Sequence, residues 1–250
     1  MYKEVILKSF NKNIKYEFIK LKNSNQPLIL RNDKTFNPTL DQWKIFLTKE
    51  CNLSIDKRQK SVNSDSYLSD FFEISYQPGK SKAYAHARTK QPFHNDNAWF
   101  KDGANLILFN MHKQAKKGGE NIFYPVEDLI KDLYKKDENL LNDLITVPVK
   151  IIKGVDESFN NTTILKNDEG WKIFWNYYRI VKNEKIINDM CERFFDFLSE
   201  KAESNSILRV RLETGDSMSF NDQRMLHGRE SFIASYTKER VLYQSMWKTV

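Results

Sequence analysis

Two short segments that lie far apart in the sequence carry side chains able to bind a metal ion. His94 and Asp96 stand in the first segment, and His227 stands in the second. Residues i and i+2 of a β-strand point to the same face, so an imidazole and a carboxylate at this spacing can reach one ion. A second imidazole from a remote strand completes a set of two histidines and one carboxylate. Such a set leaves the opposite face of the ion open, as non-haem Fe(II) oxygenases require.

A His-x-Asp pair alone is also compatible with a surface or capping role for His94. The neighbouring residues are therefore needed to identify His94 as a metal ligand. Gly228 follows His227 and permits a close backbone approach there. Arg240 lies 13 positions after His227 (240 − 227 = 13) and can pair bidentately with an acidic co-substrate. The alternative for Arg240 is a surface arginine beside Glu239. Taken together, these residues favour a metal site with an anion-binding arginine.

The other metal-binding and redox-active residue types show no comparable pattern. His86 and His112 have no carboxylate at a similar spacing, so we expect structural roles for both. The two cysteines, Cys51 and Cys191, are too few and too far apart to indicate a disulfide framework or a zinc knuckle. The sequence therefore predicts one metal site.

Length and composition indicate a cytoplasmic enzyme with a sizeable core. The chain has 250 residues, of which 40% are hydrophobic and 13% aromatic. No apolar run approaches the ~18–20 residues of a membrane span, and the first residues do not resemble a signal peptide. We find no internal repeat and no linker-like segment, and we expect residues 1–250 to form a single domain.

The net charge of +7 leaves the type of partner open. A basic balance accompanies nucleic-acid binding, anionic substrates or mere solubility. Here the basic residues are spread along the chain with acidic residues between them, and the longest basic clusters are pairs such as Lys116–Lys117. Without a basic tract or a binding motif, we expect a small-molecule substrate rather than a nucleic acid.

Three helices are expected from capping signals and apolar periodicity. Thr39 and Gln42 can form a capping box before a helix whose apolar face includes Trp43. A second helix should begin near Pro125, and its buried face is predicted to hold Leu129, Ile130 and Leu133. The third and strongest spans about 184–203, with an apolar side chain on each turn, namely Ile187, Met190, Phe194 and Phe197.

The rest of the chain is rich in strand signals. Residues 28–30 are apolar, residues 171–181 are dense in strand-favouring types, and residues 207–213 alternate apolar and polar. A turn at Gly215 precedes a further alternating strand that leads towards His227. We therefore predict a mainly β fold with flanking helices, built on a double-sheet core.

Four motifs, in order, resemble the Fe(II)/2-oxoglutarate-dependent dioxygenases of the taurine dioxygenase, γ-butyrobetaine hydroxylase and clavaminate synthase-like family. Phe93–Asn97 resembles the first metal-binding block of that family, and Gly118–Asn121 resembles its Gly-Gly-acid-Thr/Ser block. Asn221–Phe232 resembles the Leu-His-Gly-Arg-x-x-Phe block, and Arg240 matches the arginine beyond it. The resemblance extends from about Leu28 to the C-terminus. It implies a double-stranded β-helix, or jelly-roll, core.

The resemblance also implies roles for individual residues. His94, Asp96 and His227 would bind Fe(II), and Arg240 would hold the C5 carboxylate of the co-substrate 2-oxoglutarate. Asn121 departs from the family pattern, because Thr or Ser usually assists the co-substrate carboxylate there. An asparagine can still donate a hydrogen bond from its amide. The carboxylate at position 96 argues against halogenation, which in relatives needs a small residue at that place.

Substrate contacts are expected from Asn97, Asn176 and Arg229, which lie in blocks that contact substrate in relatives or adjoin a ligand. Arg229 has the alternative of anchoring the sheet. Three tryptophans offer either a cation-binding wall or ordinary core packing: Trp99, Trp171 and Trp175.

The expected activity is hydroxylation of an unactivated C–H bond with O2 and 2-oxoglutarate, releasing succinate and CO2. The expected substrate is a small polar metabolite such as a free amino acid or an amino-acid-like compound. Three alternatives stay open: a macromolecular substrate (RNA or peptide), a desaturation or cyclisation outcome, and a binding protein without turnover.

Overall fold

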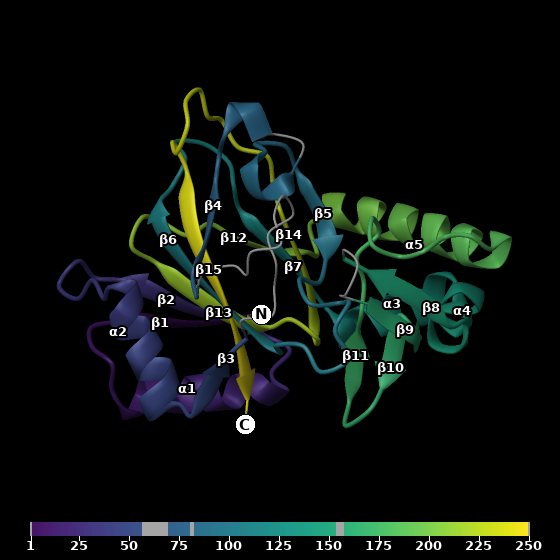
Figure 1. Ribbon diagram of the computed structural model, residues 1–250, viewed down its shortest axis with the longest axis horizontal. Helices are drawn as coiled ribbons and strands as arrows, with labels where there is room; N and C mark the ends of the chain where they lie inside the picture. Colours follow the sequence, from purple (N-terminus) through teal and green to yellow (C-terminus); the bar gives the residue numbers. More distant parts are fainter. Residues whose placement is uncertain (1, 57–69, 81–82, 154–157, 250) are drawn as a thin grey trace.

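A computed structural model describes residues 2–56, 70–80, 83–153 and 158–249. Two β-sheets lie face to face in the centre, and helices cover their outer sides (Figure 1). The predicted mainly β fold with flanking helices is confirmed. Among the described residues, no helix is both long enough and apolar enough to cross a bilayer.

The strands divide into two large and two small sheets. The first sheet contains β1 (Lys3–Leu7), β2 (Leu28–Asn32), β13 (Ser217–Asn221), β6 (Leu106–Lys113), β15 (Val241–Thr249) and β3 (Leu53–Ile55), with β4 (Phe72–Ser75) also paired to β15. The second contains β12 (Leu208–Val210), β7 (Asn121–Pro125), β14 (Met225–Arg229) and β5 (Gln91–His94). The small sheets pair β8 (Val149–Ile152) with β9 (Ser158–Thr162), and β10 (Leu165–Asn167) with β11 (Trp171–Ile173).

The helices form two groups, one at each side of the strands. Beside the first sheet lie α1 (Lys12–Lys20) and α2 (Leu40–Ile45), which continues as a π-helical turn, Phe46–Glu50. On the other side lie α3 (Val126–Lys136), α4 (Glu138–Thr146) and α5 (Lys185–Glu203). Short 3-10 turns complete the described elements: Leu21–Asn23, Pro78–Lys80 and Tyr84–His86.

The side chains of the strands contribute to three apolar clusters: one under α1 and α2, one between the two large sheets, and one under α3–α5. In β6, Leu106 and Leu108 face the cluster that α1 and α2 cover, whereas Ile107 and Phe109 face the cluster between the two sheets. In β7, Phe123 also points between the sheets, while its neighbours pack towards α3–α5. Period-two alternation therefore sends successive side chains to opposite faces, and the inward faces of both sheets enclose one interior.

All three predicted helices are present. Thr39 and Gln42 form the capping box at the start of α2. The second helix begins at Val126, directly after Pro125, and buries Leu129 and Leu133, although Ile130 is only half-buried. The third is α5, which buries every apolar residue expected on its inner face.

The strand predictions need three corrections. Only Trp171–Ile173 of the 171–181 segment is a strand, because the chain turns at Asn176–Arg179 and its aromatic residues pack against helices instead. The 207–213 strand is shorter than expected, ending at Val210. His227 does not lie at the end of a strand continuing from residue 217: β13 and β14 belong to different sheets, and His227 is the central residue of β14.

The pairing of β14 with β5 has no space for a side chain at Gly228. A Cβ atom there would lie 2.7 Å from the carbonyl oxygen of Gln91 and 3.1 Å from the Ile122 side chain. The backbone of an antiparallel ladder cannot move away from such a contact without losing hydrogen bonds. Gly228 therefore permits the close approach of the two strands that carry His227 and His94.

We expect Gly228→Ala to lower the free energy of unfolding by about 1–3 kcal/mol, as overpacking of a closed interior does. Urea denaturation measures the change. Gly79→Ala is the matched control, because a Cβ atom at Gly79 meets nothing within 4 Å. Equal losses in the two variants would show that the β14–β5 approach is not as tight as this packing indicates.

Candidate metal centre

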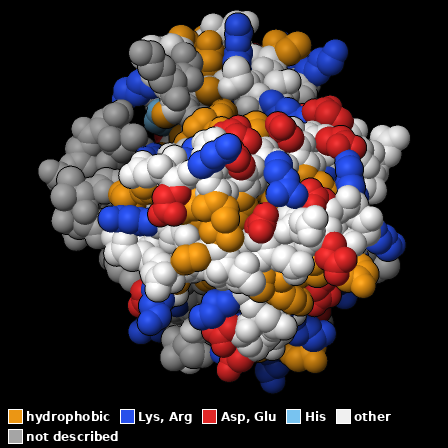
Figure 2. All heavy atoms as spheres, turned by 90° about the vertical axis from the view of Figure 1, so that its right-hand side faces the viewer, with side chains coloured by type: hydrophobic (Ala, Val, Ile, Leu, Met, Phe, Trp, Pro, Cys, Tyr) orange, Lys and Arg blue, Asp and Glu red, His pale blue; other side chains and the backbone are white. Residues whose placement is uncertain are grey.

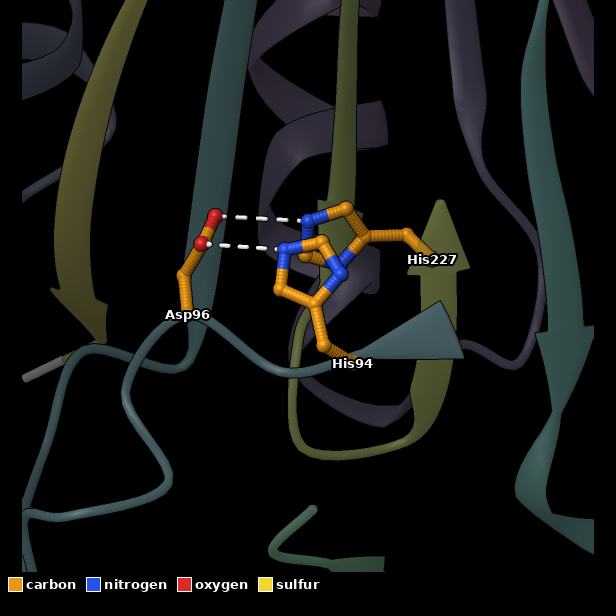
Figure 3. A group of neighbouring side chains, drawn as sticks. All are labelled: His94, Asp96 and His227. Atoms are coloured by element: carbon orange, nitrogen blue, oxygen red, sulfur yellow. Dashed lines mark ion pairs between the residues drawn. The ribbon is translucent and has the colours of Figure 1, made fainter. Parts of the chain in front are cut away.

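The side chains of His94, Asp96 and His227 converge on one point (Figure 3). Asp96 Oδ1 lies 3.4 Å from Nε2 of His94, and Asp96 Oδ2 lies 3.3 Å from Nε2 of His227. One ligand atom from each residue can be chosen so that all lie within 4.8 Å of one another. Ligand atoms bound about 2.0–2.2 Å from a metal at right angles are roughly 3 Å apart, so the three side chains are spaced as a metal requires.

Strand register brings the two histidines together. His227 pairs directly with His94 across the β14–β5 ladder, and their ring centroids are 4.3 Å apart. Directly opposed residues point to the same face of a sheet. Both imidazoles therefore enter the interior between the sheets, where Phe109 and Phe220 flank the His227 ring.

Asp222 connects both halves of this centre. Its side chain is 1% exposed and its Oδ1 lies 3.3 Å from Nδ1 of His227, on the far side of that ring from Asp96. Its carboxylate also accepts hydrogen bonds from the backbone N–H groups of Asp96 (3.1 Å) and Asn97 (3.3 Å). A carboxylate behind a histidine fixes the orientation and tautomer of the ring. Asp222 therefore orients His227 and holds the loop that carries Asp96.

The titration properties of these groups reflect their burial and proximity. Burial alone would raise the pKa of Asp96, but His227 and His94 hold that pKa well below its ordinary value. Burial alone would lower the pKa of His227, but Asp96 and Asp222 raise it to about 9. Burial raises the pKa of Asp222 above its ordinary value. Two carboxylates beside two imidazoles form a strongly cation-attracting centre.

Asn121 borders the same cavity as the three side chains. It begins β7 opposite Arg229, directly after the turn that Gly118 and Gly119 make with φ of 78° and 79°. The side chain of Asn121 is 4% exposed, and its amide nitrogen has no hydrogen-bond partner among the described residues. An unpaired buried amide is costly, which makes it a donor suited to an anionic ligand.

Arg240 also borders this cavity and is buried, so the alternative of a surface arginine is wrong. Its side chain lies over the Phe232 ring at 5.2 Å, and its Nε donates to Gln114 Oε1 at 3.3 Å. Among the described residues, no carboxylate lies within ion-pair distance of it. Burial, together with Arg229 and Arg211, lowers its pKa to about 9. Because an unpaired buried cation is costly, a guanidinium in this position suits an anionic ligand.

Arg229 also borders this cavity, and its guanidinium carbon lies 4.9 Å from the centre of the Phe232 ring. Its Nη2 donates to the carbonyl oxygens of Ala87 (2.8 Å) and Thr89 (2.9 Å). Burial lowers the pKa of Arg229 to about 10. These contacts attach the segment before β5 to β14. They agree with the alternative role considered for Arg229, that of anchoring the sheet.

Two glutamines in the cavity wall were not foreseen from the sequence. Gln244 donates to Asp96 Oδ2 at 2.5 Å, and Gln91 Nε2 lies 3.0 Å from Nε2 of His94. Gln91 shares a face with His94 despite the odd spacing, because β5 has a register shift between the pairs His227–His94 and Arg229–Gln91. Such bulges turn side chains towards active sites. For Gln244 a partial signal existed: it lies an even number of positions after Arg240, and both line the cavity, although β15 begins only at Val241.

The remaining expected contacts lie elsewhere. Asn97 and Asn176 do not line this cavity. The Asn97 amide donates to Ala104 O at 3.3 Å, and Asn176 stands in the turn closed by the Arg179 N–H. Trp99 and Trp175 belong to the core beside α3–α5, and Trp171 packs against it. His86 and His112 are likewise outside the cavity lining.

Solved structures with a similar fold are iron oxygenases. Asparagine oxygenase with Fe(II), (2S,3S)-3-hydroxyasparagine and succinate matches with a TM-score of 0.72 at 12% identity, over 94% of this chain and 77% of that one. The non-haem iron oxygenase OrfP with Fe, succinate and (3S)-hydroxy-L-Arg matches with a TM-score of 0.69 at 9% identity, over 96% and 82%. At these identities the likeness concerns the fold. No curated protein matches the sequence closely enough to count as a relative.

The sequence itself matches the model of the family described as taurine catabolism dioxygenase TauD, TfdA family, over residues 52–246. This range includes both histidines, Asp96, Asn121 and Arg240. The chain therefore belongs to the TauD/TfdA family of dioxygenases.

Proposed function

We propose that this protein is an Fe(II)- and 2-oxoglutarate-dependent oxygenase that hydroxylates a small polar metabolite, a free amino acid or an amino-acid-like compound. One observation carries the proposal. A single cavity is lined by the His94–Asp96–His227 cluster, by the Asn121 amide and by the buried Arg240, and within the described part of the chain neither the Asn121 amide nitrogen has a hydrogen-bond partner nor Arg240 a carboxylate partner. The first group suits a metal with open positions, and the other two suit a carboxylate.

The three ligand side chains fit a divalent metal by their chemistry. Two imidazoles and one carboxylate suit Fe(II), and their arrangement on one side of the cavity leaves positions open. With the metal and the co-substrate bound, O2 is activated, one oxygen atom enters a C–H bond, and succinate and CO2 are released. Asp222 keeps the His227 ring in place for this task, because its carboxylate lies against Nδ1.

Arg240 and Asn121 are the residues suited to the co-substrate. The guanidinium fork can form two parallel hydrogen bonds to the C5 carboxylate of 2-oxoglutarate, and it lies beside the Phe232 ring. The amide of Asn121 can donate to the same ligand in place of a hydroxyl group. Apolar side chains of Ile74, Phe109 and Leu242 complete the wall and keep water from the reacting centre.

The substrate class is inferred from the fold relatives and the cavity. The two structures described above contain hydroxylated asparagine and hydroxylated arginine, both free amino acids. The cavity wall offers neutral amides at Gln91 and Gln244, which suit a polar metabolite. On the face shown in Figure 2, basic and acidic side chains are intermingled, which gives no support to a nucleic-acid substrate there.

We further propose that the two large sheets form a double-stranded β-helix core and that residues 1–250 act as one domain. Residues from β5, β7, β14 and β15 line one cavity between the sheets, which supports a single functional unit. A cytoplasmic location stays a prediction.

The decisive experiment is succinate release from 2-oxoglutarate with Fe(II), ascorbate and pooled metabolites, including amino acids and betaines. We expect one pool to stimulate succinate formation, and fractionation of that pool identifies the substrate. Absence of stimulation, with 2-oxoglutarate still bound at the metal, would favour a macromolecular substrate. Failure to bind both Fe(II) and 2-oxoglutarate would refute the proposal.

His94→Ala and Asp96→Ala should each abolish substrate-stimulated succinate formation, because each removes one of three metal-binding side chains. His112→Ala is the matched control, since His112 is exposed and outside the cavity. Metal content after Fe(II) loading distinguishes loss of the ion from unfolding. Near-normal turnover in either ligand variant would remove these residues from the site.

Arg240→Ala should raise the 2-oxoglutarate concentration needed for half-maximal turnover by a factor on the order of 100 or more, since truncating one partner of a buried charged pair costs 2–5 kcal/mol. Arg240→Lys should recover only part of this loss, because an ammonium group cannot form the bidentate contact. Isothermal titration with 2-oxoglutarate and Mn(II) measures binding directly. An unchanged requirement would place the co-substrate carboxylate elsewhere.

A further inference from the structure

Gln244 is the side chain that touches the metal cluster from the opposite sheet. It lies in β15, where Leu242 and Gln244 alternate onto the inner face of the first sheet, and Arg240, directly before this strand, lines the same cavity. Its side chain is buried, and its amide nitrogen donates to Asp96 Oδ2 at 2.5 Å. This hydrogen bond joins the two large sheets across the cavity.

The contact singles out one of the two carboxylate oxygens of Asp96. Each oxygen faces one imidazole: Oδ1 lies 3.4 Å from Nε2 of His94, and Oδ2 lies 3.3 Å from Nε2 of His227. Oδ2 additionally accepts the hydrogen bond from Gln244. A lone pair used for a hydrogen bond is less available to a metal, and the bond also restrains rotation of the carboxylate. Oδ1 is therefore the better metal donor.

Gln244 is uncharged, and this matters for its contact with Asp96. A lysine or arginine at this position would neutralise Asp96 and weaken its attraction for a cation. An amide orients the carboxylate by a directional hydrogen bond and leaves its full negative charge available to the metal. The residue type thus suits orientation of a ligand rather than pairing of a charge.

We propose that Gln244 is a positioning residue that restricts Asp96 to binding the metal through one oxygen. A carboxylate bound through both oxygens would occupy one more coordination position. Because 2-oxoglutarate needs two positions and O2 needs one, a chelating Asp96 would block the reaction. This inference rests on the proposed function, since it assumes that the cluster binds a metal.

The test replaces the amide and counts the water molecules on a bound metal. In Gln244→Leu the hydrogen bond is lost at similar volume, and in Gln244→Asn the amide is retained but is one methylene too short. Tyr243→Phe is the control, because Tyr243 neighbours Gln244 in β15 but faces away from the cavity, against His112. Mn(II)-loaded protein is studied by water-proton relaxation, which reports the number of exchangeable waters on the ion.

We expect saturated Mn(II) in both Gln244 variants to carry one exchangeable water fewer than in the parent protein, with Mn(II) affinity changed by no more than about 10–100-fold, as for other residues behind metal ligands. Tyr243→Phe should match the parent. An unchanged water number in folded, saturated Gln244→Leu and Gln244→Asn would overturn the inference. A parent protein that binds no Mn(II) would refute the proposed metal site itself, so the two failures are distinguishable.

Discussion

The antiparallel register between β14 and β5 is the constraint on which the site depends. It sets His227 directly opposite His94. If the register shifted by one residue, one of the two imidazoles would point out of the interior. Gly228 permits the close approach, and Arg229 ties the segment before β5 to the same strand through backbone carbonyls. The placement of the two histidines is therefore a property of strand pairing, and the turn after β5, held by Asp222, contributes Asp96.

Burying so many charged groups between two sheets is expensive, and the structure offsets this cost locally. Asp222 is almost fully buried, yet two backbone N–H groups and the His227 ring surround its carboxylate. The guanidinium of Arg229 finds carbonyl oxygens. Arg240 has a hydrogen bond to Gln114 but no carboxylate partner among the described residues. Since an unpaired buried cation costs several kcal/mol, retaining one is intelligible where a ligand supplies the missing charge.

The sequence predicted those features that depend on residues close together in the chain, and it missed those that depend on contacts between distant segments. The capping box at Thr39 and the apolar face of α5 depend on residues within a few positions, and both were predicted correctly. The pairing of His94 with Asp96 was predicted from i, i+2 strand geometry, but β5 ends at His94, and Asp96 lies in the following turn, where its backbone N–H donates to Asp222. Gln91 was missed because a bulge cancels that rule, and Asp222 because its partners come from another strand. The 171–181 segment has strand-favouring residues, but its aromatic side chains pack against helices, and this packing rather than strand propensity determines its conformation.

The cavity is electrically polarised along β15, and this polarity defines how an acidic co-substrate would lie in it. Gln244 contacts Asp96 at the metal end, while Arg240 lies four residues earlier, directly before β15 begins, about 13 Å away along an extended backbone at ~3.3 Å per residue. The long arginine side chain spans part of that distance. A molecule with acidic groups at both ends and a few carbons between them fits the remainder, with one end at the metal and the other at the guanidinium. Gln244 places a neutral amide beside Asp96, so this contact does not cancel the carboxylate charge that would attract a metal.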